Sequence, residues 1–103
     1  MRLWECASLI RSKNAGPFWL TFDVMFSAAP PYEHVKRSGV LTAERFAELY
    51  GLHVEDVDAF ECDQALAFKF SIPRPRIQGD FGDADMHGGQ QYAPLLEIEV
   101  PQP

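Results

Sequence analysis

The chain has 103 residues, of which 47% are hydrophobic and 23% are charged, a balance typical of one globular domain with a modest core. Its net charge is −6 and it carries no basic stripe, so we expect no binding to nucleic acid. No apolar run reaches the ~20 residues of a membrane span, and the N-terminus lacks the apolar region of a signal peptide. We therefore expect a single cytoplasmic domain, residues 1–103, that does not contact a membrane.

Two strands joined by a polar loop are predicted for the first quarter of the chain. Residues 1–10 are mostly apolar with weak alternation, which is typical of a strand covered on both faces. Residues 17–26 alternate at period two and form the clearest strand, with one face made of Phe18, Leu20, Phe22, Val24 and Phe26. The polar residues 11–16 between them can close a hairpin.

Two short helices are predicted next. Pro31 suits the first position of a helix over residues 32–37. Thr42 is a good N-cap for a second helix over residues 42–50, and Gly51 is placed to end it.

The rest of the chain reads as three strands and one long loop. Residues 57–62 and 66–72 are predicted to form a second hairpin, and residues 95–100 a last strand. Residues 73–94 show no periodicity and are rich in Gly and Pro, and such long loops are often functional or ordered by a partner. The order β-β-α-α-β-β-loop-β indicates an α+β domain with its helices on one face of an antiparallel sheet.

The polar loop between the first two strands is the best candidate for a binding site. Arg11 and Lys13 supply positive charge, and Asn14 supplies an orienting amide. Ser12 adds a hydroxyl, and Gly16 lets backbone approach a ligand closely. This combination suits a carboxylate or a phosphate. The alternative is a solvated hairpin turn, in which Asn14 and Gly16 are present because they tolerate positive φ.

Few other residues suggest catalysis or metal binding. Cys6 and Cys62 fall in predicted strands, where a buried thiol is common, although a disulfide or a nucleophile stays open. The acidic stretch 80–87 is dense enough for Ca²⁺ or Mg²⁺, but it lacks the calcium-loop pattern, and Arg74 and Arg76 can pair with it. We therefore expect no metal and no cofactor, and we assign no catalytic residue.

Three apolar residues point to a protein partner. Trp4, Trp19 and Met25 fall on faces that two short helices are not expected to cover. An uncovered aromatic face on a small domain favours burial against another chain. On the same strand as Trp19, Asp23 is expected to form a cross-strand ion pair with Lys69.

Several motifs resemble the small family catalogued as domain of unknown function 4387, and the likeness covers nearly the whole chain. The motifs are residues 10–17 (IRSKNAGP), 20–23 (LTFD), 38–42 (SGVLT), 72–75 (IPRP) and 89–96 (GQQYAPLL). Typical members have Tyr where His87 stands, so the resemblance implies no catalytic role for His87. Members are commonly encoded beside, or fused to, a large chain of the AtuA-like proteins of acyclic terpene utilisation.

The resemblance also implies a more specific fold. AtuA-like proteins often carry a C-terminal ferredoxin-like domain, and residues 12–16 and 95–99 are similar to its opening loop and its closing strand. The expected fold is then a ferredoxin-like antiparallel sheet with two short helices on one face and a long Gly/Pro-rich loop before the last strand. The chain would be a small subunit that stands in for that domain.

The function implied by the resemblance is that of a small subunit of a heteromeric catabolic enzyme with an AtuA-like large chain. The substrate would be an organic acid or acyl-CoA, and the step would be of hydratase or lyase type. The carboxylate site at the interface would be made by Arg11, Ser12, Lys13 and Asn14, faced by Gln90 and Gln91. Two alternatives stay open: an independent homo-oligomer that binds a small acidic metabolite, and a purely structural assembly domain.

Overall fold

The computed structural model describes residues 1–16, 18–73 and 92–102. Its elements follow in chain order as α1 (Leu3–Cys6), β1 (Leu9–Asn14), β2 (Trp19–Met25), α2 (Ala29–Ser38), α3 (Ala43–Tyr50), the 3₁₀ turn η1 (Val54–Asp56), β3 (Asp58–Cys62), the 3₁₀ turn η2 (Asp63–Ala65), β4 (Ala67–Pro73) and α4 (Ala93–Leu96). The predicted α+β class is confirmed.

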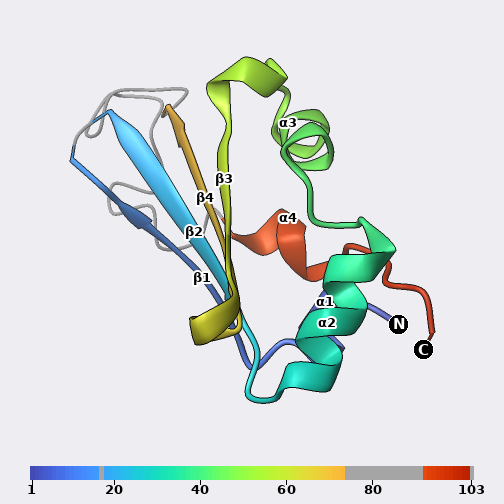
Figure 1. Cartoon of the computed structure of the whole chain (residues 1–103). Helices are drawn as coiled ribbons and strands as arrows, with labels where there is room; N and C mark the ends of the chain where they lie inside the picture. The colour runs from blue at the N-terminus through green and yellow to red at the C-terminus, as the bar shows by residue number, and fades with distance from the viewer. Residues whose placement is uncertain (17, 74–91, 103) are drawn as a thin grey trace.

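The four strands of the described residues form one antiparallel sheet in the order β1-β2-β4-β3 (Figure 1). The predicted second hairpin is present as β3 and β4. The first hairpin also forms, but its first strand is β1, which lies mostly in the predicted loop, and not residues 1–10. Pairing of β2 with β4 joins the two hairpins. Phe22 lies opposite Phe70 and Val24 lies opposite Phe68, so large apolar side chains of the two central strands meet on one face.

The two longer helices form where the sequence predicts them, although α2 begins three residues before the predicted range 32–37. Prolines occupy the first turn of α2, where the N–H groups need no partner within the helix. Thr42 caps α3 by accepting a hydrogen bond from the Arg45 N–H at 3.1 Å, and Gly51 ends that helix in the left-handed region with φ 68°. The helices lie together on one side of the sheet (Figure 1).

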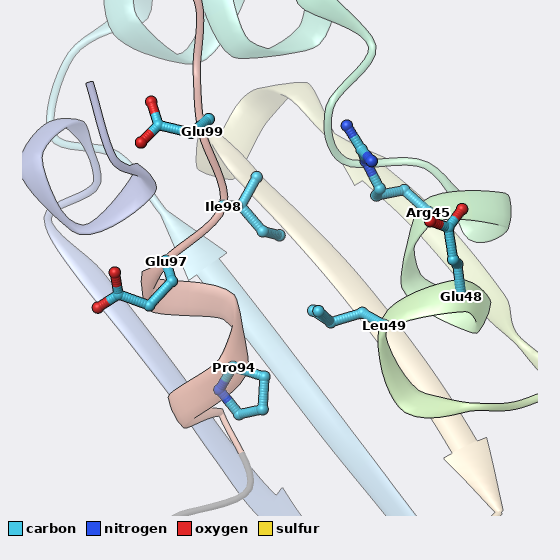
Figure 2. A pocket seen from close by; sticks show the side chains of 7 residues that line it. All are labelled: Arg45, Glu48, Leu49, Pro94, Glu97, Ile98 and Glu99. Atoms are coloured by element: carbon cyan, nitrogen blue, oxygen red, sulfur yellow. The ribbon is translucent and has the colours of Figure 1, made fainter.

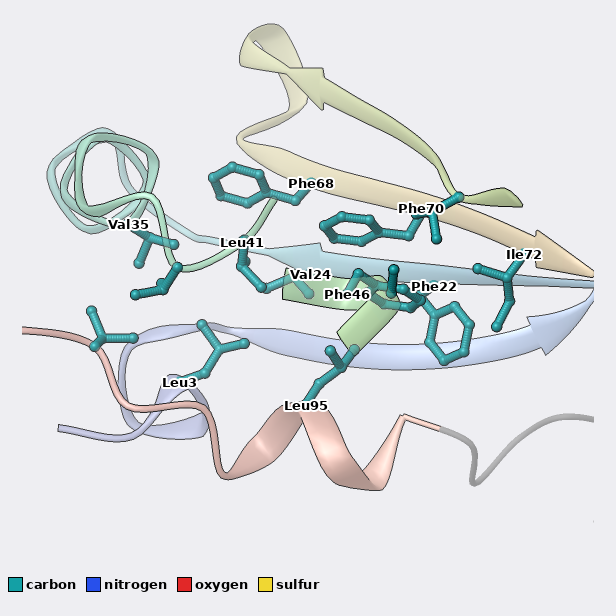
Figure 3. Packing of buried hydrophobic residues seen from close by; sticks show 14 of the residues in the cluster. Leu3, Phe22, Val24, Val35, Leu41, Phe46, Phe68, Phe70, Ile72 and Leu95 are labelled. Atoms are coloured by element: carbon teal, nitrogen blue, oxygen red, sulfur yellow. The ribbon is translucent and has the colours of Figure 1, made fainter. Parts of the chain in front are cut away.

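Aromatic side chains fill the space between the sheet and the helices (Figure 3). The ring of Phe46 from α3 stacks on Phe70 with centroids 4.5 Å apart and meets Phe22 edge-on at 4.9 Å. Leu3 from α1 and Leu95 from α4 are fully buried in the same core. Because burial stabilises by roughly 25 cal/mol per Å² of apolar surface, this covered face holds the domain together.

The prediction of strands over residues 1–10 and 95–100 is wrong for most of both ranges. The first segment forms α1, and only its last two residues enter β1. The second forms α4, followed by a single β-bridge between Glu99 and Arg2. The Arg2 N–H donates to the Glu5 carboxylate at 2.7 Å, which stabilises the first turn of α1. In α4, a proline in the first turn favours helical backbone angles. The ferredoxin-like topology is therefore not confirmed.

The two terminal segments bond to each other instead of extending the sheet. The Leu3 N–H donates to the Ile98 carbonyl at 2.8 Å, and the Val100 N–H donates to the Met1 carbonyl at 2.6 Å. Leu3 and Val100 are both buried, so the paired segments close one end of the core.

Candidate functional site

The residues predicted to form the polar loop lie mainly in a strand. Arg11 to Asn14 belong to β1, because Lys13 pairs with Thr21 and Asn14 with Leu20. The loop is therefore shorter than expected, and of the five site residues predicted between positions 11 and 16 only Gly16, with φ 84°, lies outside β1. In a strand, neighbouring side chains point to opposite faces. Strand alternation thus divides the candidate anion site between the two faces of the sheet.

Ser12 and Asn14 lie on the face that the helices cover. Ser12 is buried, and its Oγ accepts a hydrogen bond from the Tyr92 N–H at 3.1 Å. This bond ties the C-terminal segment to β1. Gln90 and Gln91, which precede Tyr92 in the sequence, lie outside the described residues.

Arg11 lies on the opposite face, in a row of charges across the sheet. Its Nε donates to Asp23 Oδ2 at 2.8 Å, and the Lys69 ammonium lies 3.6 Å from Asp23 Oδ1. Asp23 is only 5% exposed although none of the described helices covers it, and the longer side chains of Arg11 and Lys69 flank its carboxylate. The predicted Asp23–Lys69 pair is confirmed, and Arg11 joins it from β1.

No described helix or loop covers this second face of the sheet, which we call the open face (Figure 1). Read across β1, β2, β4 and β3, its three complete rows are Leu9–Met25–Ala67–Cys62, Arg11–Asp23–Lys69–Phe60 and Lys13–Thr21–Ser71–Asp58. Trp19 and Pro73 extend it at one end. These residues carry three cations and two carboxylates, so the face is slightly positive on a chain whose net charge is −6.

Two of the three predicted interface residues lie on the open face. Trp19 is 44% exposed there and Met25 is half-buried. Trp4 lies elsewhere, on α1, where it lines a groove beside β1 and α4. Phe60 of β3, which is 56% exposed on the open face, was not predicted. Its place on the open face follows from its pairing with Lys69, and that pairing can be recognised only once the strand register is known.

A groove of about 430 Å³ separates α3 from the C-terminal segment (Figure 2). Leu49 and Ile98 line it from opposite walls, and the rest of the lining is Arg45, Glu48, Pro94, Glu97 and Glu99. Arg2 forms ion pairs with two of these carboxylates, Glu97 and Glu99. Three carboxylates and one guanidinium line the groove, and Arg2 neutralises part of that negative charge, so the lining offers no excess of positive charge to an organic acid.

The titratable groups with shifted pKa values have structural partners. Burial raises the pKa of the Tyr50 hydroxyl, and burial together with a hydrogen bond to Asp63 raises the pKa of Tyr32. Both cysteines are free thiols, and burial raises the pKa of Cys6, which disfavours the reactive thiolate. None of these groups is placed as a nucleophile or a general base.

The described ranges contain no group of three or more His, Cys, Asp or Glu side chains that could hold a metal ion. The acidic stretch 80–87, considered for metal binding, lies outside those ranges. In the part of the chain that the structure describes, no helix has the length and apolar character needed to cross a membrane.

Comparison with known proteins gives one result. A search of curated proteins and a search of solved structures each found no match. A family model does match, over residues 3–99, and its description is Domain of unknown function (DUF4387). Because that match spans nearly the whole chain, the protein belongs to the DUF4387 family.

Proposed function

We propose that this protein is the small subunit of a hetero-oligomeric enzyme and that its open face binds an AtuA-like large chain. The single observation that carries the proposal is the composition of that face. Leu9, Trp19 and Phe60 are exposed there around the buried carboxylate of Asp23. Tryptophan and arginine are enriched among the residues that dominate binding energy at protein interfaces, and the open face has both. The identity of the partner comes from the family resemblance.

The charges of the open face suit burial against a protein. A charge that loses water without a partner costs several kcal/mol. Here Asp23 is already neutralised by Arg11 and Lys69, so covering the centre of the face leaves no lone carboxylate. The excess positive charge favours a partner surface that carries carboxylates beside apolar residues.

We further propose that the complex acts on an organic acid or acyl-CoA by a hydratase- or lyase-type step. Lys13 is the residue of the predicted anion site that best fits this role. It is exposed on the open face, and its ammonium makes no ion pair within the described residues, whereas Arg11 is paired with Asp23. A charge-assisted bond from Lys13 to a substrate carboxylate at the interface would be worth about 1.5–3 kcal/mol.

The test is co-expression with an AtuA-like large chain, followed by size-exclusion chromatography with mass measurement. The wild-type chain should elute with the large chain at a fixed ratio. The double variant Trp19→Ser, Phe60→Ser should lose the large chain while keeping its own fold by circular dichroism. Val54→Ser is the matched control, because Val54 is 43% exposed but lies in the helical layer. The control should retain the large chain.

Two outcomes would overturn the proposal. If the double variant retains the large chain, the open face is not the interface. If the wild-type chain elutes alone as a stable homo-oligomer, the alternative of an independent binding domain is favoured. In an active complex, Lys13→Ala should raise KM at least tenfold with an intact assembly; an unchanged KM would remove Lys13 from the substrate site.

A further inference from the structure

The strand β3 forms one edge of the sheet, and no described strand pairs with its outer side. Residues 58–61 are exposed and Cys62 is half-buried. Within the described residues β3 pairs with β4 and with no other strand. An edge of this kind presents backbone N–H and C=O groups to which another strand can bond.

The register of the sheet identifies the outward backbone groups. The Phe26 N–H donates to the Leu66 carbonyl, so even-numbered residues of β4 bond to β2 and odd-numbered ones bond to β3. Phe60, opposite an odd-numbered residue of β4, therefore bonds inward. The N–H and C=O groups of its neighbours Ala59 and Glu61 point away from the sheet, where an added strand would lie.

The exposed apolar surface of this edge is on the open face, where the Phe60 ring is more than half exposed. A groove of about 220 Å³ also runs along the edge beside Ala59 and Glu61, and the buried side chains of Leu41, Phe68 and Phe70 form part of its lining. Since successive residues of a strand point to opposite faces, an added strand could contact Phe60 with one set of side chains and this groove with the other.

The negative charge along the β3 edge favours a positively charged strand as its binding partner. The segment 54–65 carries Glu55, Asp56, Asp58, Glu61 and Asp63 and contains no Lys or Arg. Two copies of this chain pairing through β3 would bring like charges together, which destabilises cross-strand pairs. An extended segment with Lys or Arg side chains would instead be attracted.

We propose that β3 binds an extended basic segment of a partner protein as a fifth, edge-added strand. The added strand exchanges backbone hydrogen bonds with Ala59 and Glu61, and its cationic side chains face Asp58 and Glu61. This site differs from the open face and goes beyond the proposed subunit role, because it requires only an extended segment and not a docked domain.

The test uses a blocked peptide in which pairs of lysine alternate with pairs of valine, so that both faces of an added strand carry lysine and valine, and the full ¹⁵N-labelled chain in physiological salt. On titration, the amide resonances of Ala59 and Glu61 should shift the most, and their hydrogen exchange should slow at least tenfold. Two probe controls are needed. A peptide with glutamate in place of lysine tests charge, and the lysine peptide with N-methylated amides tests backbone pairing; neither should bind.

Two variants separate the backbone contribution from charge. Ala59→Pro removes one outward N–H at an edge position that tolerates proline, and it should weaken binding of the lysine peptide at least tenfold. Asp58→Lys combined with Glu61→Lys should abolish binding. The proposal is overturned if the N-methylated peptide binds equally well, if Ala59→Pro binds normally, if shifts map to the groove of Figure 2, or if the lysine peptide does not bind.

Discussion

The two faces of the sheet are built from the same strands but differ in the side chains they carry. On the covered face, Phe22, Phe46 and Phe70 pack as a tight aromatic cluster. On the open face, the corresponding positions hold the Arg11–Asp23–Lys69 charges and the exposed ring of Phe60. Because the covered face supplies the packing that stabilises the domain, the open face can carry charged and exposed aromatic side chains without loss of the core.

The largest difference in the free energy of unfolding should appear when one phenylalanine of each face is replaced by alanine. Phe70→Ala opens a cavity under α3 and should lower the free energy of unfolding by about 3–5 kcal/mol. Phe60→Ala, on the open face, should change it by no more than about 0.5 kcal/mol. Urea denaturation of both variants measures the contrast. Similar losses for the two would mean that the open face also contributes to the core.

A smaller effect on the free energy of unfolding is expected at Asp23, the buried carboxylate of the open face. Asp23→Ala removes a carboxylate that accepts a charged hydrogen bond from Arg11 and faces Lys69, and should cost about 1–3 kcal/mol. Asp58→Ala is the matched control, because that carboxylate is exposed on the same face. Urea denaturation should show a clear loss only for Asp23→Ala. Equal losses would show that the charge row of the open face does not stabilise the sheet.

The smallest effect is a pH dependence on the covered side. Tyr32 and Lys36 of α2 both donate hydrogen bonds to Asp63, and these bonds hold the pKa of that carboxyl below its usual 3.8. A lowered carboxyl pKa stabilises the fold above pH 3.8 and loses this contribution as pH falls through the folded-state value.

The expected result concerns the difference in thermal midpoint between the wild-type chain and Asp63→Asn. That difference should be constant near neutral pH and should shrink below pH 3.8. Calorimetry over that range measures it. A difference that grows with acid would contradict the assignment of the pKa shift to these two hydrogen bonds.

The sequence predicted the central strands and the longer helices because their signals are local. The period-two run of β2 and the Thr42 cap of α3 depend only on neighbouring residues. The terminal helices α1 and α4 were missed because four residues are too few for a helical period to differ from a strand. In α4, Leu95 rather than Leu96 is fully buried, which reverses the face that strand alternation would give.

The candidate site was less predictable than the fold because it depends on register. Whether Arg11 and Ser12 share a surface is decided by where the hairpin turn begins, and the pairing of Lys13 with Thr21 extends the strand past both residues. The exposure of Phe60 follows from the position of β3 at the sheet edge, which pairing between distant strands determines. Gln90 and Gln91 lie outside the described residues, so their part in the site stays a prediction.

The pairing of the two chain ends has a consequence for the order of folding. Leu3 bonds to Ile98 and Met1 to Val100, so these contacts close a loop that spans almost the entire sequence. The entropy of closing such a loop grows with its length, and contacts of high sequence separation are slow to form. The end pair should therefore assemble after the two hairpins, and it should be the first part of the core to exchange its amide hydrogens in the native state.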